Sequence, residues 1–157
     1  MVTRVDPART GVRAGRVVGL LTAGLAVATL VADRGAFREA TTLLLDLVGV
    51  DPGLSVTALF WGNVALAAAA RYSACYVVGS LLGVVYDWID RPSTTALAGL
   101  VLAVGLADGA LAALDARSAL VGAAYLLAWL CYVPVFAYLF DEDAGDARSG
   151  PRRLGAE

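Results

Sequence analysis

The stretch VTALFWGNVALAAAARYSACYVVGSLLGVVYDWI, residues 56–89, decides the class of this protein. Its 34 residues would measure roughly 51 Å as one helix, whereas a bilayer with its headgroups is about 40–45 Å thick. The alanines at 67–70 are strong helix formers, and no proline interrupts the stretch. We therefore predict an unbroken membrane-spanning helix in which Arg71 is the one charge before Asp87.

Aromatic residues near the two ends of this stretch give the depth of the arginine. Trp61 and Trp88 are 27 residues apart, roughly 40 Å along a helix, which matches the aromatic belts at two membrane interfaces. Arg71 then lies about 5 Å from the midplane, too deep for an interfacial residue. A charge at that depth is expensive unless it faces the bundle interior and has a partner.

The composition of the whole chain is typical of a membrane protein. Hydrophobic residues make up 59% and charged residues 17%, against about 25% charged in ordinary globular domains. All 12 basic residues are arginine and most of the 14 acidic ones are aspartate, a bias similar to that of haloarchaeal proteins. The absence of histidine excludes His-based catalysis, and the net charge of −2 gives no support for nucleic-acid binding.

Apolar runs predict an all-α integral membrane protein with four transmembrane helices, at residues 17–32, 56–89, 94–114 and 118–140. Residues 1–16 are predicted to be a basic N-terminal segment, and residues 141–157 an acidic, flexible tail. Pro134 should kink the fourth helix. The basic start and short first run also resemble a signal peptide with AVA at 26–28 as its cleavage site, an alternative that the residues leave open.

The segment between the first two spans is too polar to cross a membrane. Its apolar stretch is short, and Phe37, Thr41, Leu44 and Val48 recur at helical spacing. An amphipathic helix of this kind lies in the plane of the membrane surface. We therefore predict one short interfacial helix at about 37–49.

The distribution of arginine predicts which way the helices run. Four spans place both termini on one side, and that side carries eight arginines, in 1–16, in the turn at 90–93 and in the tail. The other side carries three, namely Arg34, Arg38 and Arg117. The positive-inside rule then predicts a multi-pass protein of the cell membrane with cytoplasmic N- and C-termini.

Asp108 is the predicted partner of Arg71. The turn at 90–93 makes an antiparallel hairpin of the second and third spans, in which Arg71 lies roughly 28 Å and Asp108 roughly 22 Å from the turn. An extended arginine side chain can cover the difference of about 6 Å. Two interpretations stay open: a fixed pair that sets helix register, or a pair that takes part in moving a substrate or proton.

Glycines spaced four apart indicate where helices approach closely. Gly79 and Gly83 form such a pair in the second span, and Gly105 and Gly109 form another in the third. Small residues at this spacing let two helix backbones meet. We expect the two glycine pairs to lie in the interface of the 90–93 hairpin.

Aromatic and polar side chains follow the second and fourth spans. Tyr125, Trp129 and Tyr132 recur along one face of the fourth, and Tyr72 and Tyr76 lie on the second. Such stripes are usually packing surfaces. The alternative is a slot for a lipid, quinone or carotenoid between these two spans, with Asn63 as a further polar group.

Two functional hypotheses follow. The first is a non-catalytic scaffold or accessory subunit that packs with copies of itself or with a larger membrane complex. The second is an oligomeric minimal carrier or channel for an ion or small solute, built around Arg71, Asp108 and Asn63. Small multidrug carriers offer an analogy, but they use an acidic residue in the first helix, and residues 17–32 contain none. We find no catalytic motif, CxxC pair or phosphate loop, and predict no enzyme activity, cofactor or metal.

Overall fold

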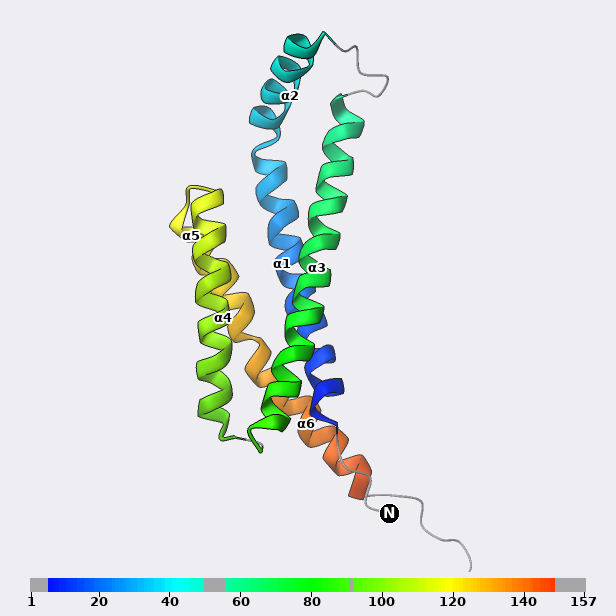
Figure 1. Cartoon of the computed structure of the whole chain (residues 1–157), viewed down its shortest axis with the longest axis vertical. Coiled ribbons are helices and arrows are strands. Elements are labelled where there is room, and N and C mark those ends of the chain that lie inside the picture. The colour runs from blue at the N-terminus through cyan, green and yellow to red at the C-terminus, as the bar shows by residue number, and fades with distance from the viewer. Residues whose placement is uncertain (1–5, 50–55, 91, 149–157) are drawn as a thin grey trace, which may run out of the picture.

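A computed structural model describes residues 6–49, 56–90 and 92–148, which are helical almost throughout (Figure 1). The helices are α1 (Pro7–Ala32), α2 (Arg34–Val48), α3 (Val56–Trp88), α4 (Thr94–Asp115), α5 (Ala119–Leu130) and α6 (Tyr132–Arg148). Four stretches are long and apolar enough to cross a membrane: Pro7–Ala32, Val56–Trp88, Thr94–Asp115 and Ala119–Asp141. The predicted helical class with four candidate spans is confirmed, and the fold is consistent with a multi-pass membrane protein.

The first helix begins at Pro7 and not at Val17, where the apolar run starts. The Asp6 carboxylate caps the helix by accepting a hydrogen bond of 3.0 Å from the Ala8 amide, and proline suits the first helical position. Residues 7–16, predicted to belong to a basic segment outside the membrane domain, are therefore helical, and several of them are buried. Residues 1–5 lie outside the described part of the chain.

Helices α1 and α3 pack along most of their length through a seam of glycines. A Cβ atom added to Gly79 would lie 2.5 Å from the Gly15 Cα, and one added to Gly11 would lie 2.5 Å from the Gly79 carbonyl oxygen. Gly83 likewise lies against the backbone of Pro7 and Ala8. The two backbones are in direct contact, which only glycine permits. The prediction that Gly79 and Gly83 face the third span is wrong, because α1 occupies that face.

Helices α4 and α5 form a second pair of the same kind. A Cβ atom on Gly109 would lie 2.7 Å from the Gly122 carbonyl oxygen, and one on Gly105 would lie 2.9 Å from the Trp129 Cβ. These two glycines therefore face α5, and not α3 as predicted. Consecutive helices α3 and α4 make few contacts with each other. Counting residues from the turn of a hairpin predicts the height of a residue along its helix. It does not predict on which side of the helix the residue lies.

The fourth candidate span is broken in the middle. Helix α5 ends at Leu130 and α6 starts at Tyr132, two residues before Pro134. Proline has no N–H to donate to the Leu130 carbonyl, and its ring displaces that carbonyl. In Figure 1, α6 turns away from α5 and passes the ends where α1 begins and α3 finishes. It continues to Arg148, so residues 141–148 of the predicted flexible tail are helical.

The predicted interfacial position of the helix after α1 is not evident. Helix α2 forms, but Figure 1 shows that it follows the end of α1 and lies beside the start of α3. The hydrogen bonding of α1 runs on through Asp33, whose amide donates to Thr29 and whose carbonyl accepts from Phe37. Phe37 then packs edge to face on Phe60 of α3, with 5.4 Å between ring centroids. These contacts join α2 to the end of α1 and to the start of α3.

The core lies where the two helix pairs meet, toward the turn between α3 and α4. It joins side chains from α1, α3, α4, α5 and α6: Ala14, Val18, Cys75, Leu82, Leu97, Val101, Trp129, Tyr132 and Phe136. The kink in the last span supplies its aromatic centre, because Tyr132 and Phe136 stack with 5.7 Å between centroids, and Tyr86 meets Phe136 edge to face. Toward the other end the two pairs diverge (Figure 1).

Candidate functional site

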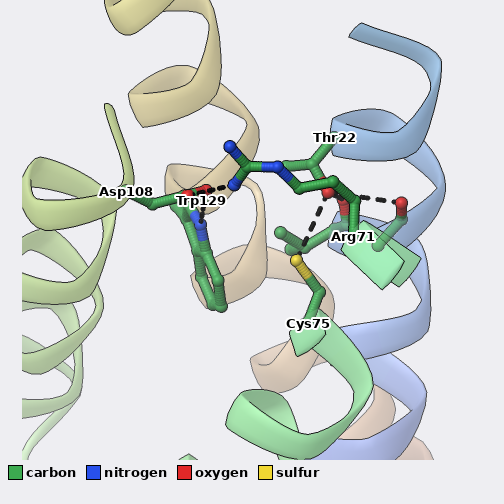
Figure 2. Close-up of polar contacts among 7 residues, drawn as sticks. Thr22, Arg71, Cys75, Asp108 and Trp129 are labelled. Carbon is green, nitrogen blue, oxygen red and sulfur yellow. Dashed lines mark hydrogen bonds and ion pairs between the residues drawn. The ribbon is translucent and has the colours of Figure 1, made fainter. Parts of the chain in front are cut away.

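An ion pair joins the two helix pairs at the point where they begin to diverge. Arg71 extends from α3, and its Nη1 donates a hydrogen bond to Oδ1 of Asp108 on α4 (Figure 2). The Arg71 side chain is 31% exposed and the Asp108 side chain 18%. The structure thus brings together the two charged residues singled out in the sequence. Because α3 and α4 hardly touch, the long arginine stem spans the distance between them.

Helix α5 completes the site with two aromatic side chains. Trp129 donates from its indole Nε1 to the second carboxylate oxygen of Asp108, over 3.0 Å (Figure 2). The Arg71 guanidinium carbon lies 4.7 Å from the centroid of the Tyr125 ring, a cation–π contact. Tyr125 and Trp129 are four residues apart and so share one face of α5. Both carboxylate oxygens of Asp108 are therefore occupied by donors from different helices.

Two further hydrogen bonds tie the neighbouring helices together. The Thr22 hydroxyl on α1 lies 3.3 Å from the Cys75 sulfur on α3 and also bonds to the Val18 carbonyl (Figure 2). On the other side, the buried Tyr132 hydroxyl donates to the Gly79 carbonyl over 2.9 Å. In the described part of the chain, every buried side-chain nitrogen and oxygen has a partner.

The remaining predicted slot residues do not gather in one place. Tyr72 lies against Gly19 in the α1–α3 seam, and exposed Tyr76 has the guanidinium of Arg16 above its ring, 5.6 Å from the centroid. Asn63 is exposed near the start of α3. Only Tyr125, Trp129 and Tyr132 face the centre of the fold. The residues of the alternative aromatic slot are therefore not gathered between the second and fourth spans.

A cleft of about 450 Å³ opens beside the ion pair, between the diverging helix pairs. Its lining comes from four helices: Ala26, Thr29, Leu30, Ala67, Ala70, Arg71, Ala74, Asp115 and Tyr125. The walls are mainly alanine and leucine, with Arg71 and Asp115 as the two charged members. The alanine run that favours a helix in the sequence thus has a second consequence, because its small side chains leave this space open.

Sequence reasoning missed three parts of this arrangement. Gly11, Gly15 and Gly19 are spaced four apart, a readable packing signal that lies among arginines. The sequence places Trp129 on an aromatic stripe but does not indicate that it donates to Asp108. No feature of the sequence indicates the cleft. Among the residues that the structure describes, no three Cys, Asp or Glu side chains gather closely enough to hold a metal ion.

Together these features define a class: a small helical protein with four candidate membrane spans, built as two glycine-packed helix pairs that one ion pair bridges. Comparison with protein-family models, with curated proteins and with solved structures found no match.

We expect Tyr132→Phe to destabilise the fold by about 1 kcal/mol, because a buried hydroxyl loses its bond to the Gly79 carbonyl. Unfolding of the detergent-solubilised protein by added SDS measures the change. Tyr138→Phe on the same helix is the matched control, since that side chain is exposed and should leave the midpoint unchanged. Equal midpoints for the two variants would argue against the bond.

Proposed function

We propose that this chain is a non-catalytic membrane protein, a small scaffold or accessory subunit in which the Arg71–Asp108 pair is a fixed clamp. The observation that carries the proposal is the double occupation of Asp108, whose two oxygens accept from Arg71 and Trp129 on different helices. A carboxylate bonded in this way links α3, α4 and α5, and each of its oxygens already accepts one hydrogen bond. The pair lies between helices inside the fold, as buried charges of membrane proteins nearly always do, and its hydrogen bonds link three helices.

We further propose how the protein lies in the membrane. Helix α2 buries none of its residues and exposes Leu43, Leu44, Leu47 and Val48, so this face suits the boundary between headgroups and acyl chains. The arginine count supports an orientation with both termini in the cytoplasm. Arg9 and exposed Arg16 would then reach the anionic headgroups of the inner leaflet.

The glycine faces are used inside the chain, so a partner would contact the large apolar side chains that remain outside. Photoreactive amino acids at exposed Leu66 on α3 and Leu106 on α4 would locate it in native membranes. We expect one of these positions to give an adduct of defined mass, either a second copy or a larger subunit. The other position serves as the matched control. Adducts with lipid alone from both positions would contradict the subunit proposal.

The second candidate, a minimal carrier or channel, draws its support from the cleft that ends at Arg71. Purified protein in liposomes would be assayed for flux of protons, potassium and chloride. On the scaffold proposal, these fluxes equal those of empty liposomes. Flux that is present in the wild type and lost in folded Asp108→Asn would favour the carrier instead.

A further inference from the structure

The cleft beside the clamp contains hydrogen-bond donors that the protein itself does not use. Arg71 donates to Asp108 through Nη1 alone, while Nε and Nη2 have no acceptor among the described residues. Neither of these nitrogens is buried without a partner, and Arg71 is part of the cleft lining. A guanidinium has five N–H donors, and within a bilayer each needs an acceptor.

The charges around the cleft decide what kind of acceptor fits. The Arg71 guanidinium is already paired with Asp108, which is not part of the lining, and in the described part of the chain Asp115 is the one carboxylate that lines the cleft. An anionic ligand would therefore meet two negative charges and one positive charge. A cation would have to approach the guanidinium. A neutral oxygen acceptor, such as a carbonyl, can take the spare N–H groups without either repulsion.

The shape and walls of the cleft indicate the rest of the ligand. Its volume of about 450 Å³ is in the usual range for a small-molecule site of roughly 300–1,000 Å³. Alanine and leucine from α1 and α3 make up most of the walls, which suits an apolar body. We propose that this cleft binds a neutral amphiphile from the bilayer through a carbonyl oxygen that accepts from Arg71. The carbonyl could belong to a quinone ring or to a lipid ester.

Trp129 is a reporter for this site, because it shares the Asp108 carboxylate with Arg71. The chain has three tryptophans, and the other two, Trp61 and Trp88, are 50% and 85% exposed. A Trp61→Phe/Trp88→Phe background therefore isolates the Trp129 fluorescence. Decylubiquinone and a brominated diacylglycerol, both indole quenchers, would be titrated separately into the protein in detergent micelles. We expect saturable quenching by at least one of them, and the probe that saturates identifies the quinone or the lipid source.

Neighbouring alanines provide matched variants that leave the ion pair intact. Ala70 lines the cleft, whereas Ala69, also exposed, does not. We expect Ala70→Leu to raise the quenching midpoint about tenfold or more by filling the cleft, and Ala69→Leu to leave it unchanged. Arg71→Ala/Asp108→Ala, which removes the donors along with their partner, should also raise it about tenfold, as for the loss of one hydrogen bond to a charged group.

Three outcomes would overturn the proposal. The first is quenching by both neutral probes that rises linearly and equally in all variants, which indicates partition into the micelle alone. The second is saturable quenching that Ala70→Leu does not weaken. The third is tighter binding of an anionic probe, dibromostearate at pH 8, than of either neutral one. None of these results depends on whether the chain is a scaffold, because the clamp is tested by stability and the cleft by probe binding.

Discussion

Gly79→Leu should prevent α1 and α3 from packing and should remove most of the folded population. A Cβ atom there would already be 2.5 Å from the Gly15 Cα, so the rest of a leucine has no space unless the two helices separate. Overpacking a core commonly costs about 1–3 kcal/mol, and here the obstacle is backbone, which cannot change rotamer. We expect a loss of at least about 3 kcal/mol, a large share of the roughly 5–15 kcal/mol that stabilises a typical protein. The SDS unfolding midpoint and the yield of monodisperse protein measure it.

The chain supplies its own controls for this substitution. Gly62 on α3 and Gly24 on α1 have no atom within 4 Å of an added Cβ. Gly62→Leu and Gly24→Leu should therefore unfold near the wild-type midpoint, although each makes the same chemical change on the same helix as a seam glycine. A Gly79→Leu protein as stable as Gly62→Leu would refute the α1–α3 seam.

Arg71→Ala and Asp108→Ala should each destabilise the protein by about 3–5 kcal/mol, because each leaves a charge without its partner in an apolar setting. The double variant should regain most of that loss. About 1 kcal/mol should remain, since Trp129 would still lack the acceptor for its indole N–H. A double-mutant cycle on the SDS unfolding midpoints separates the pairwise coupling from the single effects.

Exposed charges on α2 give the matched comparison for this cycle. Arg38 and Glu39 are both exposed, and alanine at either position should shift the midpoint by no more than about 0.5 kcal/mol. Wild-type stability in both Arg71→Ala and Asp108→Ala would show that the clamp contributes nothing. A double variant worse than either single one would show that the two residues act independently.

The number of candidate spans could be predicted from the sequence because length and apolar composition alone determine it. The predicted spans at 56–89 and 94–114 match α3 and α4 within one residue at both ends. The span predicted at 118–140 matches α5 at its start. The first span does not match, because Arg9, Arg13 and Arg16 predict a polar segment outside the bundle, whereas α1 begins at Pro7. Helix α1 tolerates them by packing its glycine side against α3 and exposing Arg9 and Arg16 on the outside.

Height along a helix could also be predicted, but the side of the helix could not. Rise per residue placed Arg71 and Asp108 at compatible levels, and a long side chain can reach a partner across a wide gap. Glycine has no side chain, so its partner must be the helix in direct contact. Both α1 and α4 carry glycines spaced four apart, so this spacing alone does not decide which of them is the neighbour of Gly79. Because the neighbouring helix could not be predicted, the sequence indicates only a packing role for Trp129. In the structure its indole N–H donates to Asp108.

The short turn between α3 and α4 connects two helices that have their main partners elsewhere, α1 and α5 respectively. In chain order, the main packing partner of α1 therefore comes only with α3, and that of α4 only with α5. The two backbone seams therefore divide the chain into two consecutive parts, one with α1 and α3 and one with α4 and α5. The clamp and the aromatic core join these two parts, and the peptide link between α3 and α4 keeps them at high local concentration.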